Sequence, residues 1–224
     1  MNEDGFVSKL FDELSSDTIT TVYGAPGCGK STLCFQYLCA KVQSGKHVFF
    51  VDTEGGFSPE RIQQICPSCN LNKISVFSVK SFEEQERVIR GLHKGITNNK
   101  NVGLIIVDSL VMLYRLKLGD SPKDINSKLA QQLSLLTEIS RTFNIPILVT
   151  NQMYTNFETK EKTMVGGSLV RYWSKIIIEL EREQGIGTAT LKKHKFKKEG
   201  QMFTYEIHVQ GFVETSKKDF KFFR

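Results

Sequence analysis

The chain has 224 residues, of which 40% are hydrophobic and 24% charged, as in an ordinary globular protein. No run of about 18 apolar residues is present, so we expect no membrane span, and the acidic residues within 1–16 argue against a secretory signal. The formal net charge is +6, and residues 184–224 hold nine Lys or Arg against four Asp or Glu. We expect a cytoplasmic chain. The excess positive charge near the C-terminus indicates either a nucleic-acid or other acidic partner, or only a basic surface exposed to solvent.

Apolar, β-branched segments alternate with segments of helical periodicity over the first 150 residues. We predict strands at 18–23, 47–51, 74–79, 103–107 and 145–150, and helices at 30–44, 59–66, 81–97 and 124–143. Residues 104–107 and 147–149 are apolar throughout, as strands of a parallel sheet are when both faces are covered. The alternation predicts an α/β fold with a mostly parallel, twisted sheet.

The pattern changes after Gly167. Residues 176–180, 187–196 and 202–209 are predicted strands, separated by turn residues such as Gly185 and Gly200. Because we expect no helix between them, they should pair antiparallel at one edge of the same sheet. No Pro- or Ser-rich linker and no internal repeat interrupts the sequence, so we expect one domain over residues 1–224.

Residues 24–31 form a phosphate-binding motif. They match the P-loop pattern G-x-x-x-x-G-K-[ST] between a predicted strand and a predicted helix, with the sequence Gly24-Ala25-Pro26-Gly27-Cys28-Gly29-Lys30-Ser31. Backbone N–H groups and the helix N-terminus would surround the phosphates of ATP, together with Thr32. Lys30 is expected to bridge the β- and γ-phosphates and Ser31 to ligate Mg²⁺. A structural Gly-rich turn is the alternative, which the flanking strand and helix disfavour.

A second acidic motif follows the predicted strand at 103–107. Asp108 would lie beside the P-loop at the carboxyl end of that strand, in the Walker B position, and hold Mg²⁺ directly or through water. An Asp that only caps a loop is the alternative.

A third motif is Val-Asp-Thr-Glu-Gly-Gly-Phe-Ser-Pro-Glu-Arg at 51–61. Its strand ending would bring Glu54 near the γ-phosphate, where a base can polarise the attacking water. Together with the P-loop and Thr150-Asn151-Gln152, this segment resembles the RecA superfamily, and within it the archaeal RecA-like recombinase paralogues. The resemblance runs in co-linear order from about residue 18 to about residue 211.

The resemblance implies a RecA-like P-loop NTPase core with Glu54 as the catalytic base. It also implies that Gln152 senses the γ-phosphate and couples it to the following loop, and that Arg61 stacks on adenine. A polar strand-end residue without a ligand is the alternative for Gln152, and a helix-surface residue is the alternative for Arg61.

Two loops should face DNA if the resemblance holds: 110–123 and 153–167. Basic residues interleaved with aromatic ones suit phosphate neutralisation and base stacking, and these are Tyr114, Arg115, Lys117, Tyr154, Phe157, Lys160 and Lys162. Loops are polar in any case, and Glu158 and Glu161 dilute the second one.

The densest basic run is 192–198. Related ATPases place a Lys or Arg from this region against the γ-phosphate of a neighbouring subunit, so Lys193 or Lys195 would be a finger in trans in a homo-oligomer. A solvated hairpin face or a DNA-backbone patch explains the run equally well.

The five cysteines are expected to be unpaired thiols in a reducing compartment. Cys66 and Cys69 form a lone CxxC, and no second CxxC or close His pair supplies the other two ligands of a structural zinc site. We therefore predict two incidental thiols at a helix end.

Strand-exchange recombinases carry an N-terminal DNA-binding domain and a linker strand that hooks the next subunit, whereas this chain reaches its P-loop within 24 residues. We therefore expect an accessory factor of DNA repair and recombination: a weak Mg²⁺-dependent ATPase that prefers single-stranded DNA. Its expected protein partners are the principal recombinase and a Holliday-junction resolvase. The alternatives are a nucleotide-switched scaffold with negligible hydrolysis and a KaiC-like regulatory ATPase that does not act on DNA. A small-molecule kinase lacks support, because no Arg-rich lid is present.

Overall fold

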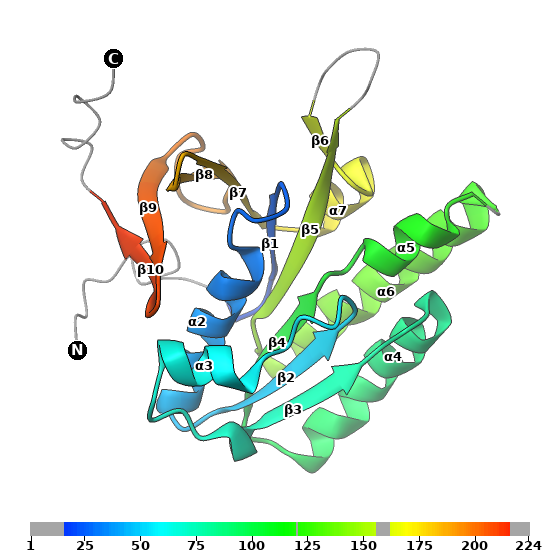
Figure 1. The fold of residues 1–224 in the computed structure, drawn as a ribbon. Coiled ribbons are helices and arrows are strands. Elements are labelled where there is room, and N and C mark those ends of the chain that lie inside the picture. The colour runs from blue at the N-terminus through cyan, green and yellow to red at the C-terminus, as the bar shows by residue number, and fades with distance from the viewer. Residues whose placement is uncertain (1–15, 120, 156–161, 216–224) are drawn as a thin grey trace.

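The computed structural model describes residues 16–119, 121–155 and 162–215, and a long twisted sheet forms its centre (Figure 1). The strand order is β10-β9-β8-β7-β1-β5-β4-β2-β3, and β6 pairs with β5 off this path. Neighbouring strands from β3 to β7 are parallel, whereas the pairs from β7 to β10 are antiparallel. The predicted fold class is confirmed: a mostly parallel sheet continues into an antiparallel C-terminal edge.

The elements have the following bounds. The strands are β1 (Ile19–Gly24), β2 (His47–Asp52), β3 (Ile74–Ser78), β4 (Val102–Asp108), β5 (Ile147–Thr155), β6 (Lys162–Met164), β7 (Ile176–Glu183), β8 (Ile186–Lys193), β9 (Met202–His208) and β10 (Gly211–Glu214). The helices are α2 (Lys30–Gln43), α3 (Pro59–Ile65), α4 (Phe82–Asn98), α5 (Met112–Lys117), α6 (Pro122–Phe143) and α7 (Gly167–Trp173), with a 3-10 turn, η1, at Leu71–Lys73.

The central strands are buried on both faces, which explains why they are apolar throughout. In β4, Leu104 and Ile106 pack into one hydrophobic core, whereas Ile105 and Val107 pack into the other. Successive side chains of a strand point to opposite faces, so only a strand covered on both sides keeps four apolar residues in a row. The sheet therefore separates two cores.

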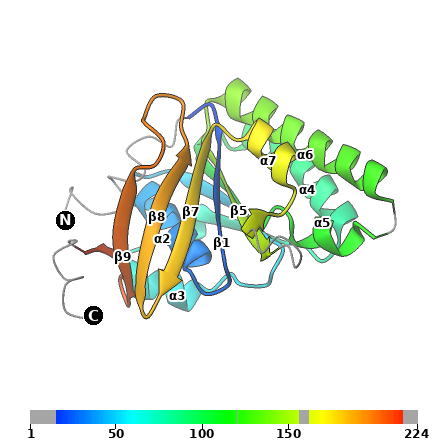
Figure 2. The same ribbon diagram turned by 90° about the horizontal axis from the view of Figure 1, so that it is seen from above.

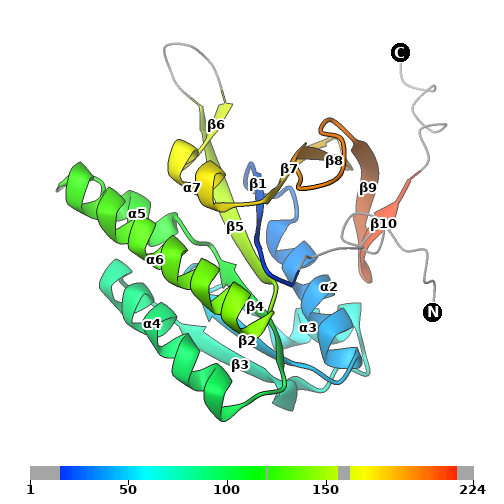
Figure 3. The ribbon, with the colours of Figure 1, turned by 180° about the vertical axis from the view of Figure 1, so that it is seen from behind.

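Helices cover the two faces separately. Buried residues of α2 and α3 belong to the first core, and buried residues of α4, α5, α6 and α7 belong to the second. Figure 3 shows α4 and α6 side by side across one face, and Figure 2 shows α2 and α7 on opposite sides of β1. Among the described residues, no helix combines the length and the apolar character that crossing a membrane requires.

The structure differs from the predicted elements mainly in its short helices. Residues 110–123 were expected to be a loop, yet they contain α5 and the start of α6, and α7 was not predicted. α5 and α7 complete too few turns to show a clear 3.6-residue period, and neither begins with a start signal such as the Ser-Pro pair that precedes the equally short α3. The predicted antiparallel pairing of the C-terminal strands is confirmed for β7, β8 and β9, and β7 joins this edge to the rest of the sheet by pairing parallel with β1.

Candidate active site

The P-loop joins β1 to α2 and depends on its glycines. Gly29 has φ 100°, and a Cβ built on it would lie 2.5 Å from Cδ1 of Ile207. A Cβ on Gly24 would lie 2.2 Å from the carbonyl oxygen of Leu180 in β7. Because the backbone passes so close to β7 and β9, larger residues at these two positions would displace the loop.

The start of α2 is arranged for an anion. Gly29 caps it without a side-chain hydrogen bond, and its first turn contains no acidic residue. The first N–H groups of a helix have no intrahelical acceptor and carry partial positive charge. The Lys30 ammonium donates to the carbonyl oxygens of Gly24 and Ala25, each at 2.9 Å, so it lies over the loop that would hold the phosphates.

Two strands of the antiparallel edge of the sheet, β9 and β10, contact the P-loop. The buried Tyr205 of β9 donates its hydroxyl hydrogen to the carbonyl oxygen of Cys28 at 2.7 Å. Its ring packs against that of Phe212, whose atoms also lie close to Gly29. β9 and β10 therefore hold the P-loop in position, which sequence reasoning did not predict.

Asp108 lies at the end of β4, directly opposite Asp52 of β2. It is buried, and the Thr150 hydroxyl donates to its Oδ1. Burial raises the pKa of Asp108, hydrogen bonds from Thr150 and Ser31 oppose that rise, and the nearby charges of Glu54 and Asp52 add to it. The Ser31 hydroxyl and the Asp108 carboxylate are hard oxygen donors brought together, so these two residues fit Mg²⁺.

Asp52 organises the segment that carries Glu54. Its Oδ1 accepts N–H hydrogen bonds from Glu54 at 3.2 Å, Gly55 at 2.9 Å and Gly56 at 3.1 Å. Its Oδ2 accepts a fourth from Phe57 at 3.1 Å. A carboxylate held by four N–H groups fixes the turn that follows β2, and the exposed Glu54 side chain leaves from that turn.

Gln152 meets Glu54 across the end of the sheet. It is paired in register with Gly24, the first P-loop residue, and its Nε2 donates to Oε1 of Glu54 at 2.9 Å. The carboxyl ends of parallel strands meet at one edge, where ligands of α/β proteins bind. The predicted base, sensor, metal ligand and P-loop are thus brought together at that edge.

Arg61 lies in α3, whose first turn is capped by Ser58. Its guanidinium donates to the carbonyl oxygens of His208 at 2.9 Å and Val209 at 2.8 Å, in the turn between β9 and β10. The structure places Arg61 against this turn, and its stacking on adenine stays a prediction.

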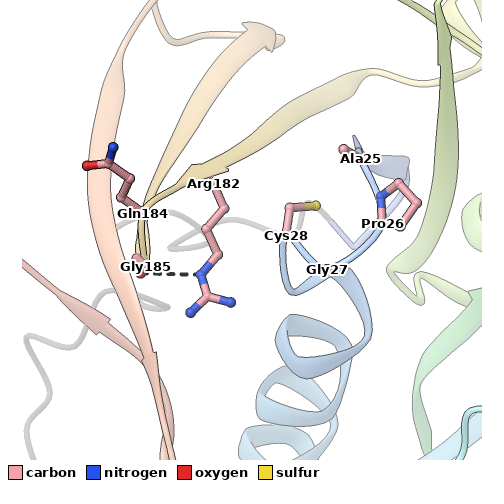
Figure 4. A pocket seen from close by; sticks show the side chains of 7 residues that line it. All are labelled: Ala25, Pro26, Gly27, Cys28, Arg182, Gln184 and Gly185. Carbon is pink, nitrogen blue, oxygen red and sulfur yellow. Dashed lines mark hydrogen bonds between the residues drawn. The ribbon is translucent and has the colours of Figure 1, made fainter.

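A pocket of about 320 Å³ opens between the P-loop and the turn that joins β7 to β8 (Figure 4). The exposed Arg182 lines it, opposite Pro26 and Gly27, and its Nε donates to the carbonyl oxygen of Gly185 at 3.2 Å. No sequence motif marks Arg182; only the pairing of β7 with β1 brings it to the P-loop. It is a phosphate-binding candidate that sequence reasoning missed.

The first predicted DNA loop requires a correction at Tyr114. This residue lies in α5 and is buried, with its hydroxyl donating to Oδ1 of Asn126 at 2.6 Å, so its ring is not available to stack on a base. Arg115 is exposed. The Lys117 ammonium pairs with the carboxylate of Glu83 at 3.2 Å.

The second predicted DNA loop, 153–167, includes the end of β5 and all of β6, which pair antiparallel and lie near the top of Figure 1. Tyr154 is 49% exposed there, as a stacking residue must be. Lys162 begins β6 opposite Thr155. Phe157 and Lys160 lie outside the described residues.

Lys193 and Lys195, the two candidates for a residue that acts on a neighbouring subunit, both bind partners within this chain. The Lys193 ammonium donates to the carbonyl oxygens of Arg171 and Ser174, each at 2.7 Å, and so caps the end of α7. Burial, together with the charges of Lys175 and Arg171, lowers the pKa of Lys193. The Lys195 ammonium lies 3.0 Å from the Asp17 carboxylate. A role in trans would require either amine to leave these partners.

The five cysteines are free and buried. A third thiol lies beside the CxxC segment, because Cys39 of α2 lies next to Cys66 and Cys69; that these thiols are incidental stays a prediction. The local pattern gave no sign of this contact, since Cys39 is 27 residues before Cys66 in the sequence.

Comparison with known proteins gives a consistent result. The Rad51 family model matches residues 6–211. The chain is 38% identical over 202 residues to the DNA repair and recombination protein RadB of Methanosphaera stadtmanae, covering 87% of each chain. It is also 38% identical over 208 residues to RadB of Methanococcus maripaludis, covering 90% of this chain and 94% of the relative. A crystal structure of the RadB recombinase aligns with a TM-score of 0.78 and 32% identity, over 94% of this chain and 96% of the other. The resemblance predicted from the motifs is confirmed.

Proposed function

The chain belongs to the Rad51 family, and on this premise we propose that it is a Mg²⁺-dependent, weak ATPase that binds DNA in repair and homologous recombination. Two similar proteins of nearly the same length are named DNA repair and recombination proteins. The observation that carries the proposal is the meeting of Lys30, Ser31, Asp108, Glu54 and Gln152 at one edge of the sheet.

The proposed roles follow from the positions of the side chains. Lys30 and the N–H groups at the start of α2 bind the β- and γ-phosphates. Ser31 and Asp108 would hold Mg²⁺, which would neutralise phosphate charge when bound. Glu54 would accept the proton of a water molecule directed at the γ-phosphate, and Gln152 would exchange its bond to Glu54 for one to that phosphate.

We place DNA near the exposed Arg115 and Tyr154, with Phe157, Lys160 and Lys162 as further candidates in the second loop. The basic and aromatic character of this surface suits single-stranded DNA. We propose that the protein acts in the cytoplasm as an accessory factor to the principal recombinase, with a Holliday-junction resolvase and a second copy of itself as further partners.

A nucleotide-switched scaffold with negligible hydrolysis is the second candidate function. One observation that favours it is the hydrogen bond from Gln152, which occupies one oxygen of the proposed base Glu54. A second is that Lys193 and Lys195 bind partners within the chain and are therefore not free to reach the nucleotide of a neighbouring subunit. In this alternative, ATP changes partner choice without turnover.

One experiment separates these functions. ATP hydrolysis is measured under single-turnover and steady-state conditions without DNA, with single-stranded DNA and with branched DNA, at two salt concentrations. We expect slow hydrolysis that single-stranded DNA accelerates less at the higher salt concentration. Lys30→Ala supplies the background rate. If the protein binds ATP but hydrolyses it no faster than this background, the scaffold is favoured. If the acceleration by DNA does not decrease at the higher salt concentration, the phosphate contacts are contradicted.

A further inference from the structure

Three buried cysteines form a cluster on the face of the sheet covered by α2 and α3. Cys39 lies in α2, Cys66 caps the end of α3, and Cys69 lies in the turn that follows. All three side chains are buried, and their Sγ atoms lie within 4.8 Å of one another. Two segments that are distant in the sequence therefore bring three sulfur atoms close together.

The backbone around the cluster is held in place. The Cys69 N–H donates to the carbonyl oxygen of Cys66 at 3.0 Å, which closes the turn of the CxxC segment. Gln43, the last residue of α2, donates from Nε2 to Sγ of Cys66 at 3.1 Å. A polar donor directed at a buried sulfur is the kind of outer contact that orients metal ligands.

Ionisation of Cys39 and of Cys69 is disfavoured in the absence of a cation. Burial, and then the proximity of the other thiols, raises the pKa of Cys39, and burial raises the pKa of Cys69 as well. Cys39 and Cys69 thus resist ionisation partly because a neighbouring thiolate would also carry negative charge. A dication between them removes that repulsion and replaces the thiol protons.

We propose that Cys39, Cys66 and Cys69 form a thiolate site for a divalent cation of the zinc class. A Zn–S bond of about 2.3 Å places tetrahedral thiolates about 3.8 Å apart, so the three sulfurs need to approach by only about 1 Å. A water molecule would supply the fourth ligand, so this site would have three protein ligands and not the four of the closed zinc site that the sequence argues against. A disulfide would use only two of the three sulfurs, which does not account for their mutual convergence.

The site would join two helices that flank the proposed nucleotide site. α2 begins at Lys30, whereas α3 follows the turn that carries Glu54 and contains Arg61. A metal bound at the far ends of both helices would fix their relative position. It would lie away from the phosphates, so its role would be structural.

The test begins with full-length protein from which metals have been removed by a chelator under reducing conditions. Titration with Co²⁺ should give a thiolate charge-transfer band that saturates at one ion per chain and is displaced by Zn²⁺. Cys39→Ser should weaken binding by at least about tenfold, the loss that even an outer contact of a metal site causes. Cys34→Ser is the matched control, because Cys34 is also buried in α2 but does not belong to the cluster.

X-ray absorption on zinc-loaded wild-type protein makes the test independent of whether the variant folds. We expect three sulfur ligands per zinc. The proposal fails if wild type gives no thiolate band, if zinc has fewer than three sulfur neighbours, or if soluble Cys39→Ser binds Co²⁺ as tightly as Cys34→Ser.

Discussion

Gln152 donates a hydrogen bond from Nε2 to Oε1 of Glu54 at 2.9 Å, which joins the expected γ-phosphate sensor directly to the expected base. Gln152 is the residue of β5 that pairs with Gly24 of the P-loop, and β5 continues into the hairpin that carries Tyr154. A change in the partner of Gln152 would therefore alter both the freedom of the base and the start of the proposed DNA-binding hairpin.

Replacement of the base should separate binding from turnover. Glu54→Gln keeps the shape of the side chain but cannot accept a proton, so we expect kcat to fall by about 10²–10⁴-fold while ATP affinity is retained. Steady-state hydrolysis and equilibrium nucleotide binding measure the two effects. Glu60→Gln, an exposed carboxylate in the first turn of α3, is the control and should hydrolyse ATP like wild type. Normal turnover in Glu54→Gln would show that another group is the base.

Loss of the sensor should uncouple DNA from hydrolysis. Gln152→Ala leaves the P-loop and Asp108 intact, so ATP binding should persist, while acceleration by single-stranded DNA should disappear. Rates measured across a DNA titration check this. Gln63→Ala, which removes an exposed amide of α3, is the control. If Gln152→Ala responds to DNA as wild type does, the coupling does not pass through this side chain.

Asp52 should support catalysis without contacting the nucleotide. Asp52→Asn exchanges one acceptor oxygen for an amide that faces the N–H donors of the turn, and we expect a loss of about 1–3 kcal/mol in unfolding free energy. Because the turn positions Glu54, kcat should fall while ATP affinity changes little. Urea unfolding and hydrolysis assays test the two effects. An unchanged kcat in a destabilised variant would limit Asp52 to a structural role.

Asp108→Asn should stabilise the protein in the absence of Mg²⁺ and ATP and make it less stable than wild type in their presence. Because burial raises the pKa of Asp108 above its ordinary value, its ionisation destabilises the folded chain as pH rises from that ordinary value through the shifted one. Without Mg²⁺ and ATP, Asp108→Asn should therefore unfold at a higher temperature than wild type near neutral pH, and the difference should shrink as pH falls.

With Mg²⁺ and ATP the order should reverse, because the variant lacks the carboxylate ligand and gains less from binding. Thermal unfolding between about pH 4 and 8 measures both effects. A variant that is less stable than wild type under both conditions would show that the Thr150 hydrogen bond outweighs the cost of the buried charge.

Local peptides account for what could be predicted from the sequence. The P-loop, Asp108 and Glu54 each belong to a short motif whose spacing determines its place at a strand end. Features that depend on long-range packing were not predictable. The burial of Tyr114 follows from its contacts with Phe82 and Asn126, and the contact of Cys39 with the CxxC segment requires α2 and α3 to pack together.

The support of the P-loop by the antiparallel edge gives the last prediction. Tyr205→Phe removes the hydroxyl that donates to the buried carbonyl oxygen of Cys28, so the acceptor loses this partner without a change in shape. We expect a loss of about 1–3 kcal/mol in unfolding free energy, together with weaker ATP binding because Cys28 belongs to the phosphate loop. Tyr172→Phe, at a ring that is 72% exposed on α7, should change neither quantity. If Tyr205→Phe is destabilised but binds ATP with wild-type affinity, β9 stabilises the fold without positioning the phosphate loop. If neither quantity changes, the hydroxyl contributes nothing measurable at this position.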